Sequence, residues 1–385
     1  MRKGWEYKKL GEIAKCAIGL TYKPENVTEE LSGTIVLRSS NIQNSILDFN
    51  DIVRVNVPVK EDKIVKDGDI LMCSRNGSIR LVGKVALIKN LKERMSYGAF
   101  MTIIRSQYNP YLFEYFKTPA FRQYLIAGKT TTVNQITVKM LNNLTIPLPP
   151  KSTQLAIVSE LDKINELIRL KKEQLKDFDN LAQSLFYEMF GDPVENEKGW
   201  EVKKLGDVCE VVTGTTPKTN IPEFWGKGHY WVTPAELNDT TVYIDKTERQ
   251  ITDEALRKTK LRLLPVGTVL LSSRAPIGKV AIINAEMYCN QGFKNCICSE
   301  AICNKYLFYF LRMMKDYLKS LGRGATFKEI SKSIVENIRI PLPPLPLQQL
   351  FAQRIEQIER EKSEVQKSIQ DLETLLASRM QYWFE

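Results

Sequence analysis

Ile146-Pro147-Leu148-Pro149-Pro150 precedes a long helical pattern, and the same five residues return at 340–344 ahead of a second such pattern. Near the start of the chain, Gly4-Trp5-Glu6-Tyr7-Lys8-Lys9-Leu10-Gly11 returns as Gly199-Trp200-Glu201-Val202-Lys203-Lys204-Leu205-Gly206. The offset is 194 residues for the proline motif and 195 for the tryptophan motif. Such a repeat indicates two homologous halves, which form a pseudo-dimer within one polypeptide. Because the copies have diverged, the chain can bind a ligand made of two unlike parts.

Each half contains a region with mixed strand and helix signals. Short aliphatic runs between turn residues predict strands. These runs lie at 35–38, 69–73, 84–88, 230–233, 268–271 and 279–283. Amphipathic helices are expected near 110–127 and 303–321. The sequence therefore predicts an α+β fold with two homologous mixed α/β domains.

The proline motifs predict where the domains end, because consecutive prolines fit neither a helix interior nor a central strand. Ser152 or Thr153 is expected to cap the helix that follows the first motif, and Pro346 suits the first turn of the second helix. The chain is accordingly divided into a first domain, a central helical spacer, a second domain and a distal helical spacer. These segments are 1–150, 151–196, 197–344 and 345–385.

Both spacers repeat apolar residues at the 3.5-residue period of a coiled coil. A helix of nearly forty residues is ~55 Å long, and its apolar seam requires a partner. That partner is the other copy, running antiparallel about a pseudo-two-fold axis, or another chain. Lys171, Lys362 and Arg379 interrupt the seam. The predicted helix–helix seam consists of Leu161, Ile164, Ile168, Leu175, Phe178, Leu185, Ile355, Ile358, Val365, Ile369, Leu372 and Leu376.

Positive charge is concentrated outside the two spacers. The whole chain carries a net charge of +10, yet segments 151–190 and 346–385 together carry −3. The remainder therefore holds a surplus of +13. A basic surplus confined to two domains is typical of proteins that bind a polyanion such as nucleic acid. Ordinary solvated surface is the alternative interpretation.

Several classes of protein do not fit the composition. No apolar run approaches the ~18–20 residues of a membrane span, and the first residues lack the apolar stretch of a signal peptide. Seven cysteines fit a reducing compartment. We therefore expect a cytoplasmic protein with no membrane partner.

Catalytic and metal-binding signatures are also missing from the sequence. The chain has one histidine, His229, and neither a P-loop nor a Gly-rich dinucleotide motif. The cysteines at 289, 296, 298 and 303 lack the C-x2-C spacing of a zinc site, so they are interpreted as small buried side chains. The sequence predicts a binding protein with no catalytic residue and no metal.

Candidate binding residues lie at corresponding loop edges of the two halves. Ser74-Arg75 and Ser273-Arg274 each end a strand, and the loop that follows is four residues longer in the first half. Arg or Lys can contact phosphate or guanine, and Asn or Gln can contact adenine. For each residue the alternative is a turn or a surface ion pair. The candidates are Arg38, Ser39, Asn41, Arg75, Asn76, Arg80, Lys84, Lys129, Thr130, Thr131, Thr233, Arg274, Lys279, Asn290, Gln291, Arg323, Thr326 and Lys328.

The sequence motifs follow one another in the same order in both halves. Together they make the whole chain resemble the specificity subunits of type I restriction–modification enzymes. The resemblance rests on the tryptophan motifs, the Ser-Arg…Gly-Lys-Val-Ala segments, Asn290-Gln291-Gly292-Phe293 and the proline motifs with their helices. It implies that each domain reads one half of a bipartite, asymmetric sequence in double-stranded DNA. It also implies that the helices set the gap between the half-sites and dock two modification subunits.

The same resemblance implies partners that carry the chemistry. Modification subunits would use S-adenosylmethionine to methylate adenine, and restriction subunits would use ATP and Mg²⁺. This chain would then be non-catalytic and without a cofactor of its own. The first half has Glu30-Leu31-Ser32-Gly33 where the second has Glu223-Phe224-Trp225-Gly226, so the two domains are expected to read different sequences. A coiled-coil adaptor for proteins and a stand-alone nuclease are the alternative functions.

Overall fold

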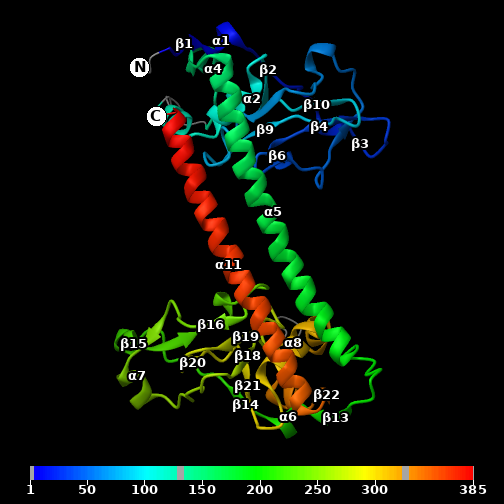
Figure 1. Cartoon of the computed structure of the whole chain (residues 1–385), viewed down its shortest axis with the longest axis vertical. Coiled ribbons are helices and arrows are strands. Elements are labelled where there is room, and N and C mark those ends of the chain that lie inside the picture. The colour runs from blue at the N-terminus through cyan, green and yellow to red at the C-terminus, as the bar shows by residue number, and fades with distance from the viewer. Residues whose placement is uncertain (1–3, 128–133, 323–328, 385) are drawn as a thin grey trace. The chain divides into compact units, whose positions relative to one another are not determined.

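The computed structural model describes residues 4–127, 134–322 and 329–384 (Figure 1). The chain separates into two units. The first unit contains Met1–Lys172 and Ser368–Glu385, and the second contains Glu173–Lys367. Each unit therefore combines one mixed α/β region with part of both long helices, α5 (Lys151–Phe190) and α11 (Leu345–Phe384).

In the first unit, the central sheet is antiparallel, with strand order β2-β11-β8-β9. These strands are Lys15–Ile18, Met101–Arg105, Ile70–Cys73 and Val85–Leu87. A second sheet has the order β10-β4-β7-β3, in which β10 and β4 are parallel. Its strands are Met95–Tyr97, Thr34–Leu37, Arg54–Val55 and Val27–Thr28. The two-stranded pairs are β1 (Glu6–Lys9) with β12 (Thr145–Leu148), and β5 (Ile42–Gln43) with β6 (Ile46–Leu47).

The second unit repeats this pattern. Its main sheet has the order β14-β21-β18-β19-β16. These strands are Cys209–Thr213, Lys294–Cys298, Val269–Leu271, Val280–Ile283 and Tyr243–Ile244. The order β17-β15-β20 describes the other sheet, with strands Gln250–Ile251, Trp225–Val232 and Tyr288–Cys289. β13 (Glu201–Lys204) pairs with β22 (Arg339–Leu342) as β1 pairs with β12.

Short helices complete each unit. In the first unit they are α1 (Leu10–Ile13), α2 (Asn109–Phe116), α3 (Pro119–Ala127), α4 (Val138–Asn143), η1 (Pro24–Asn26), η2 (Ser39–Asn41) and η3 (Glu61–Lys63). In the second they are α6 (Leu205–Val208), α7 (Asp253–Lys258), α8 (Asn304–Met313), α9 (Lys315–Leu321), α10 (Lys332–Glu336), η4 (Pro222–Phe224) and η5 (Pro234–Glu236). The predicted α+β fold with two long helices is confirmed.

Matching hydrogen bonds show that the repeat extends to local geometry. Gln154 Nε2 donates to the carbonyl oxygen of Pro149 at 2.7 Å, and Gln348 Nε2 donates to that of Pro343 at 2.7 Å. Each glutamine thereby holds its proline motif against the first turn of the long helix. Gly68 and Gly267 both have φ of +87°, a backbone conformation that favours glycine at the turn before β8 and β18.

The mixed α/β region of each unit packs around parts of both long helices. In the first unit, Ile157 and Leu161 of α5 join a core that also contacts Met380 and Phe384 of α11. In the second unit, Phe186 and Phe190 of α5 share a core with Phe351 of α11. Sequence periodicity did not single out these three phenylalanines, although they are almost fully buried.

The structure corrects two predictions about the helices. The predicted helix at 110–127 is divided into α2 and α3, because Lys117 and Thr118 between them are not helical, and the one at 303–321 is divided into α8 and α9. The proposed cap at Ser152 or Thr153 is wrong, since α5 already begins at Lys151. Pro346 lies in the first turn of α11, as predicted.

Within each unit, the segments of α5 and α11 run antiparallel. In the first unit Lys172 pairs with Glu373 at 2.7 Å, and Arg379 pairs with Glu160. Trp383 Nε1 also donates to Glu160 Oε2 at 2.8 Å. Lys362, the other interruption of the second helix's seam, pairs with Asp179 at 2.6 Å in the second unit. Arg379 and Lys362, the two predicted interruptions in the second helix, therefore form ion pairs with residues of α5.

The predicted seam residues lie on the inner or partly covered faces of the two helices. Leu161, Ile164, Ile168, Ile355, Ile358, Val365 and Ile369 are buried, and Leu175, Phe178, Leu185, Leu372 and Leu376 are partly buried. Within residues 4–127, 134–322 and 329–384, none of the helices combines the length and the hydrophobicity that a membrane span requires.

Candidate nucleic-acid interface

Three loops of the first unit are joined by hydrogen bonds into one surface. These loops are 38–41, 74–83 and 97–101, and we call them the first loop surface. The backbone N–H of Arg75 donates to the carbonyl oxygen of Phe100 at 3.0 Å, and Asn76 Nδ2 donates to Ser39 Oγ at 3.2 Å. The surface borders a hollow of about 750 Å³, whose lining includes Tyr22 and Arg38. The fold thus brings together Arg38, Ser39, Arg75 and Asn76, four of the predicted contact residues.

Two cationic side chains of this surface have different surroundings. Arg38 forms an ion pair with Asp51 at 2.7 Å. The guanidinium of Arg75 lies 5.2 Å from the ring centroid of Phe100, whose side chain is 57% exposed. An arginine above an exposed aromatic ring is available to bases both by stacking and by hydrogen bonding. Arg80 is exposed within the 74–83 loop, and half-buried Lys84 follows directly after that loop.

Asn41 has a structural role that the sequence did not reveal. Its side chain is 1% exposed, and its Oδ1 accepts a hydrogen bond from the backbone N–H of Arg38 at 2.8 Å. Its Nδ2 donates to the carbonyl oxygens of Asp48 and Asp51. The amide is thus fully engaged in shaping the turn, so contact with a base would require these bonds to break.

The second unit builds the corresponding surface from 233–236, 273–278 and 289–293, which we call the second loop surface. Ser273 N–H donates to the Gly292 carbonyl at 2.8 Å, as Ser74 N–H donates to that of Phe100 at 2.9 Å. Glu236 Oε2 accepts from the backbone N–H of Thr233 at 2.6 Å, so it replaces Asn41 in the turn. The two surfaces share a backbone frame but carry different side chains.

The other predicted residues of the second unit are partly engaged. Gln291 is exposed and bonded to Thr216, and the Oδ1 of half-buried Asn290 accepts from Gly292 N–H at 2.9 Å. Lys279 Nζ donates to the Leu237 carbonyl, which ties it to the domain. Six predicted contacts lie outside the described residues, namely Lys129, Thr130, Thr131, Arg323, Thr326 and Lys328.

A network of three charged residues extends from the interior of the second unit to its loop surface. Lys294 Nζ lies 3.1 Å from Glu329 Oε1, and Arg274 Nε lies 2.9 Å from Glu329 Oε2. Burial acts to raise the pKa of Glu329, but hydrogen bonds from Lys294 and Arg274 lower the pKa overall. Sequence reasoning identified Arg274 but missed Glu329 and Lys294. Glu329 lies 55 residues after Arg274 and 35 residues after Lys294, so no local pattern links the three residues.

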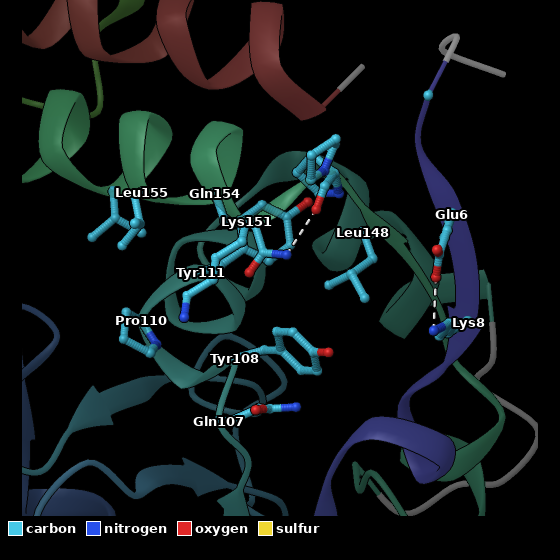
Figure 2. Close-up of a pocket in the computed structure, with 14 residues that line it drawn as sticks. Glu6, Lys8, Gln107, Tyr108, Pro110, Tyr111, Leu148, Lys151, Gln154 and Leu155 are labelled. Atoms are coloured by element: carbon cyan, nitrogen blue, oxygen red, sulfur yellow. Dashed lines mark hydrogen bonds and ion pairs between the residues drawn. The ribbon is translucent and has the colours of Figure 1, made fainter.

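A second hollow of the first unit lies beside the start of α5 and has a volume of about 540 Å³ (Figure 2). Tyr108, Leu148 and Leu155 line it, together with the Glu6–Lys8 ion pair. Its lining mixes apolar and charged groups without a nucleophile paired to a base. No group of three or more potential metal ligands occurs in the described part of the chain.

The family model "Type I restriction modification DNA specificity domain" matches residues 2–177 and again 197–374. The putative type I restriction enzyme MjaX specificity subunit of Methanocaldococcus jannaschii is 27% identical, over 97% of this chain and 92% of the relative. The MjaIX specificity subunit of the same organism is 38% identical over 49% of this chain, and the matched region spans 44% of that relative.

Solved structures agree on the fold. A chain from a study of complex assembly and conformational transition of the type I R-M system has a TM-score of 0.65, with 22% identity, over 100% of this chain and 98% of that one. The type I restriction-modification system S subunit from M. genitalium has a TM-score of 0.58, with 14% identity, over 99% of this chain and 96% of that one. Because the family model matches most of the sequence in two copies, the chain belongs to the type I restriction modification DNA specificity domain family.

Proposed function

We propose that this chain is the non-catalytic DNA-specificity subunit of a type I restriction–modification complex. Each mixed α/β domain reads one half of a bipartite, asymmetric site in double-stranded DNA. The observation that carries this proposal is the pair of loop surfaces, which have the same backbone frame and different side chains. Arg38 and Asn41 of the first surface correspond to Thr233 and Glu236 of the second.

A common frame with different side chains suits recognition of two unlike half-sites. Hydrogen bonds to base edges in the major groove distinguish all four base pairs, so a changed set of donors and acceptors changes the sequence that is read. The first surface offers Arg75 above Phe100, whereas the second offers Arg274 and Gln291. The basic surplus outside the long helices supplies the attraction to phosphate.

Salt dependence tests whether DNA is the ligand. Contacts to phosphate release counterions, so we expect the affinity for a duplex carrying the site to fall at least ~10-fold between 50 and 200 mM salt. Fluorescence anisotropy with a labelled duplex measures this change, and a duplex of random sequence is the control. If micromolar protein binds neither duplex at low salt, the alternative of a coiled-coil protein adaptor is favoured.

We further propose that α5 and α11 set the gap between the half-sites and dock two modification subunits. Both helices keep large apolar side chains exposed although their seam residues are covered. These are Leu155, Leu167, Leu170 and Leu181 on α5, and Leu350 and Leu375 on α11. Exposed apolar surface of this kind supports docking of other proteins.

In this scheme, all cofactors belong to partner subunits. S-adenosylmethionine would bind the modification subunits, and ATP and Mg²⁺ would serve the restriction subunits. The remaining alternative is a stand-alone nuclease. Incubating the pure chain with plasmid DNA and Mg²⁺ tests it, because our proposal predicts no cleavage above that of a buffer control.

A further inference from the structure

The network of Lys294, Glu329 and Arg274 is built around a lysine that water barely reaches. The Lys294 side chain is 6% exposed, and its Nζ lies 3.1 Å from Glu329 Oε1 and 3.3 Å from Ser273 Oγ. A buried ammonium requires such partners, because an unpaired charge in the interior is strongly unfavourable. Lys294 in turn fixes Glu329 at a defined position beside the second loop surface.

Glu329 then restricts the orientation of Arg274. Its Oε2 accepts from Arg274 Nε at 2.9 Å, and the arginine side chain is 49% exposed. In the part of the chain that the structure describes, no partner is recorded for the two terminal nitrogens of Arg274. A guanidinium is a rigid planar fork, so binding through Nε leaves that terminal edge presented as a pair of donors. The network keeps a net charge of +1 and remains attractive to DNA.

The first unit shows that the fold does not require this network. Arg75 forms the same isolated β-bridge with Gln135 that Arg274 forms with Glu329. By strand register, Thr102 of β11 occupies the place of Lys294 in β21. Neither the lysine nor the carboxylate is therefore present in the first unit. Since apolar or neutral residues can replace a buried ion pair without loss of stability, a network found in only one copy points to a role beyond folding.

We propose that Glu329, anchored by Lys294, is a positioning residue that presets Arg274 to read a guanine in the half-site of the second domain. Bidentate donation to guanine O6 and N7 is the commonest specific contact of arginine, and it uses two donors on one edge of the fork. Because Glu329 already fixes the Arg274 side chain before DNA binds, less conformational entropy is lost on binding. This inference rests on the proposed function. It assigns a guanine to one of the proposed base contacts, Arg274, and names Glu329 as the residue that holds this arginine in place.

Single-base substitution across the second half-site tests the assignment. The site is first obtained by selection of duplexes with the full chain, and affinities are then measured for every single-base variant. We expect Arg274→Ala to abolish the preference at one G·C pair, a loss of about 10-fold in discrimination. Glu329→Gln should weaken the preference at that same pair while leaving the first half-site and the salt dependence unchanged. Glu210→Gln is the matched control, because it removes the carboxylate from an exposed ion pair with Arg262. It should change neither the preference at that G·C pair nor the salt dependence.

A double variant separates this effect from misfolding. Lys294→Thr with Glu329→Gln copies the Thr102 and Gln135 of the first unit and leaves no buried charge unpaired. We expect it to fold with native circular dichroism and to lose the same guanine preference. The inference is overturned if Arg274→Ala lowers affinity equally for all sequences, which indicates a phosphate contact, or if the double variant keeps full discrimination. If the wild-type chain selects no sequence at all, the proposed function itself fails.

Discussion

Replacing Phe351 by alanine is expected to destabilise the second unit by about 3–5 kcal/mol, which is the usual cost of removing a buried phenylalanine. The Phe351 side chain is 0% exposed. Its ring centroid lies 5.2 Å from that of Phe190, 5.3 Å from that of Tyr309 and 5.7 Å from that of Phe186. Phe351 thus joins both long helices to the mixed α/β region, and its loss leaves a cavity that these rings can fill only in part.

Urea unfolding of the full chain measures this effect. The unfolding transition of the second unit should move to lower urea, and that of the first unit should remain in place. Leu350→Ala provides the control, because its side chain is 42% exposed and its removal should cost under about 1 kcal/mol. Equal losses for the two variants would show that the core around Phe351 does not hold the second unit together.

Lengthening both long helices is expected to change the spacing of the recognised site. We would insert seven residues after Lys172 in α5 and seven after Lys367 in α11, where each helix passes from one unit to the other. Seven residues preserve the heptad phase and add ~10 Å of helix, which corresponds to about three base pairs of duplex. Affinity for the original site should fall on the order of 100-fold, because only one half-site can then be engaged.

The same protein should recover affinity on a duplex whose gap is three base pairs longer. Competition binding against a series of gap lengths measures the shift, and the wild-type chain on the same series is the control. An unchanged preferred gap would contradict the proposed role of the helices. A change in the half-site bases would contradict the proposal that the domains recognise the bases and the helices set only the length of the gap.

The sequence predicted the main features of the fold, because repeated motifs and apolar periodicity can both be recognised in short stretches of sequence. The six short aliphatic runs became strands β4, β8, β9, β15, β18 and β19 within one to a few residues. The breaks at Thr118 and at Met314 were missed, because the amphipathic pattern continues across them. Residues of two successive helices that contribute to one core can mimic a single longer helix.

The candidate interface was only partly predictable, because its geometry depends on contacts between distant segments. Arg75 and Arg274 were identified from their position after equivalent strands. In contrast, Phe100 and Glu329 were missed, since nothing in their neighbouring sequence indicates that they lie beside these arginines. Asn41 shows why the role of a polar loop residue is hard to predict: such a residue has the same appearance in sequence whether it contacts a ligand or stabilises its own turn, as the Asn41 side chain does here.

Selection from a pool of random duplexes tests the central claim most directly. The full chain, together with the modification subunits that we propose as its partners, is used to retain bound duplexes over several rounds, and the retained duplexes are sequenced. We predict two short, different blocks of fixed sequence separated by a constant number of unconstrained base pairs. Enrichment of one contiguous block, of a palindrome, or of no sequence would contradict the account.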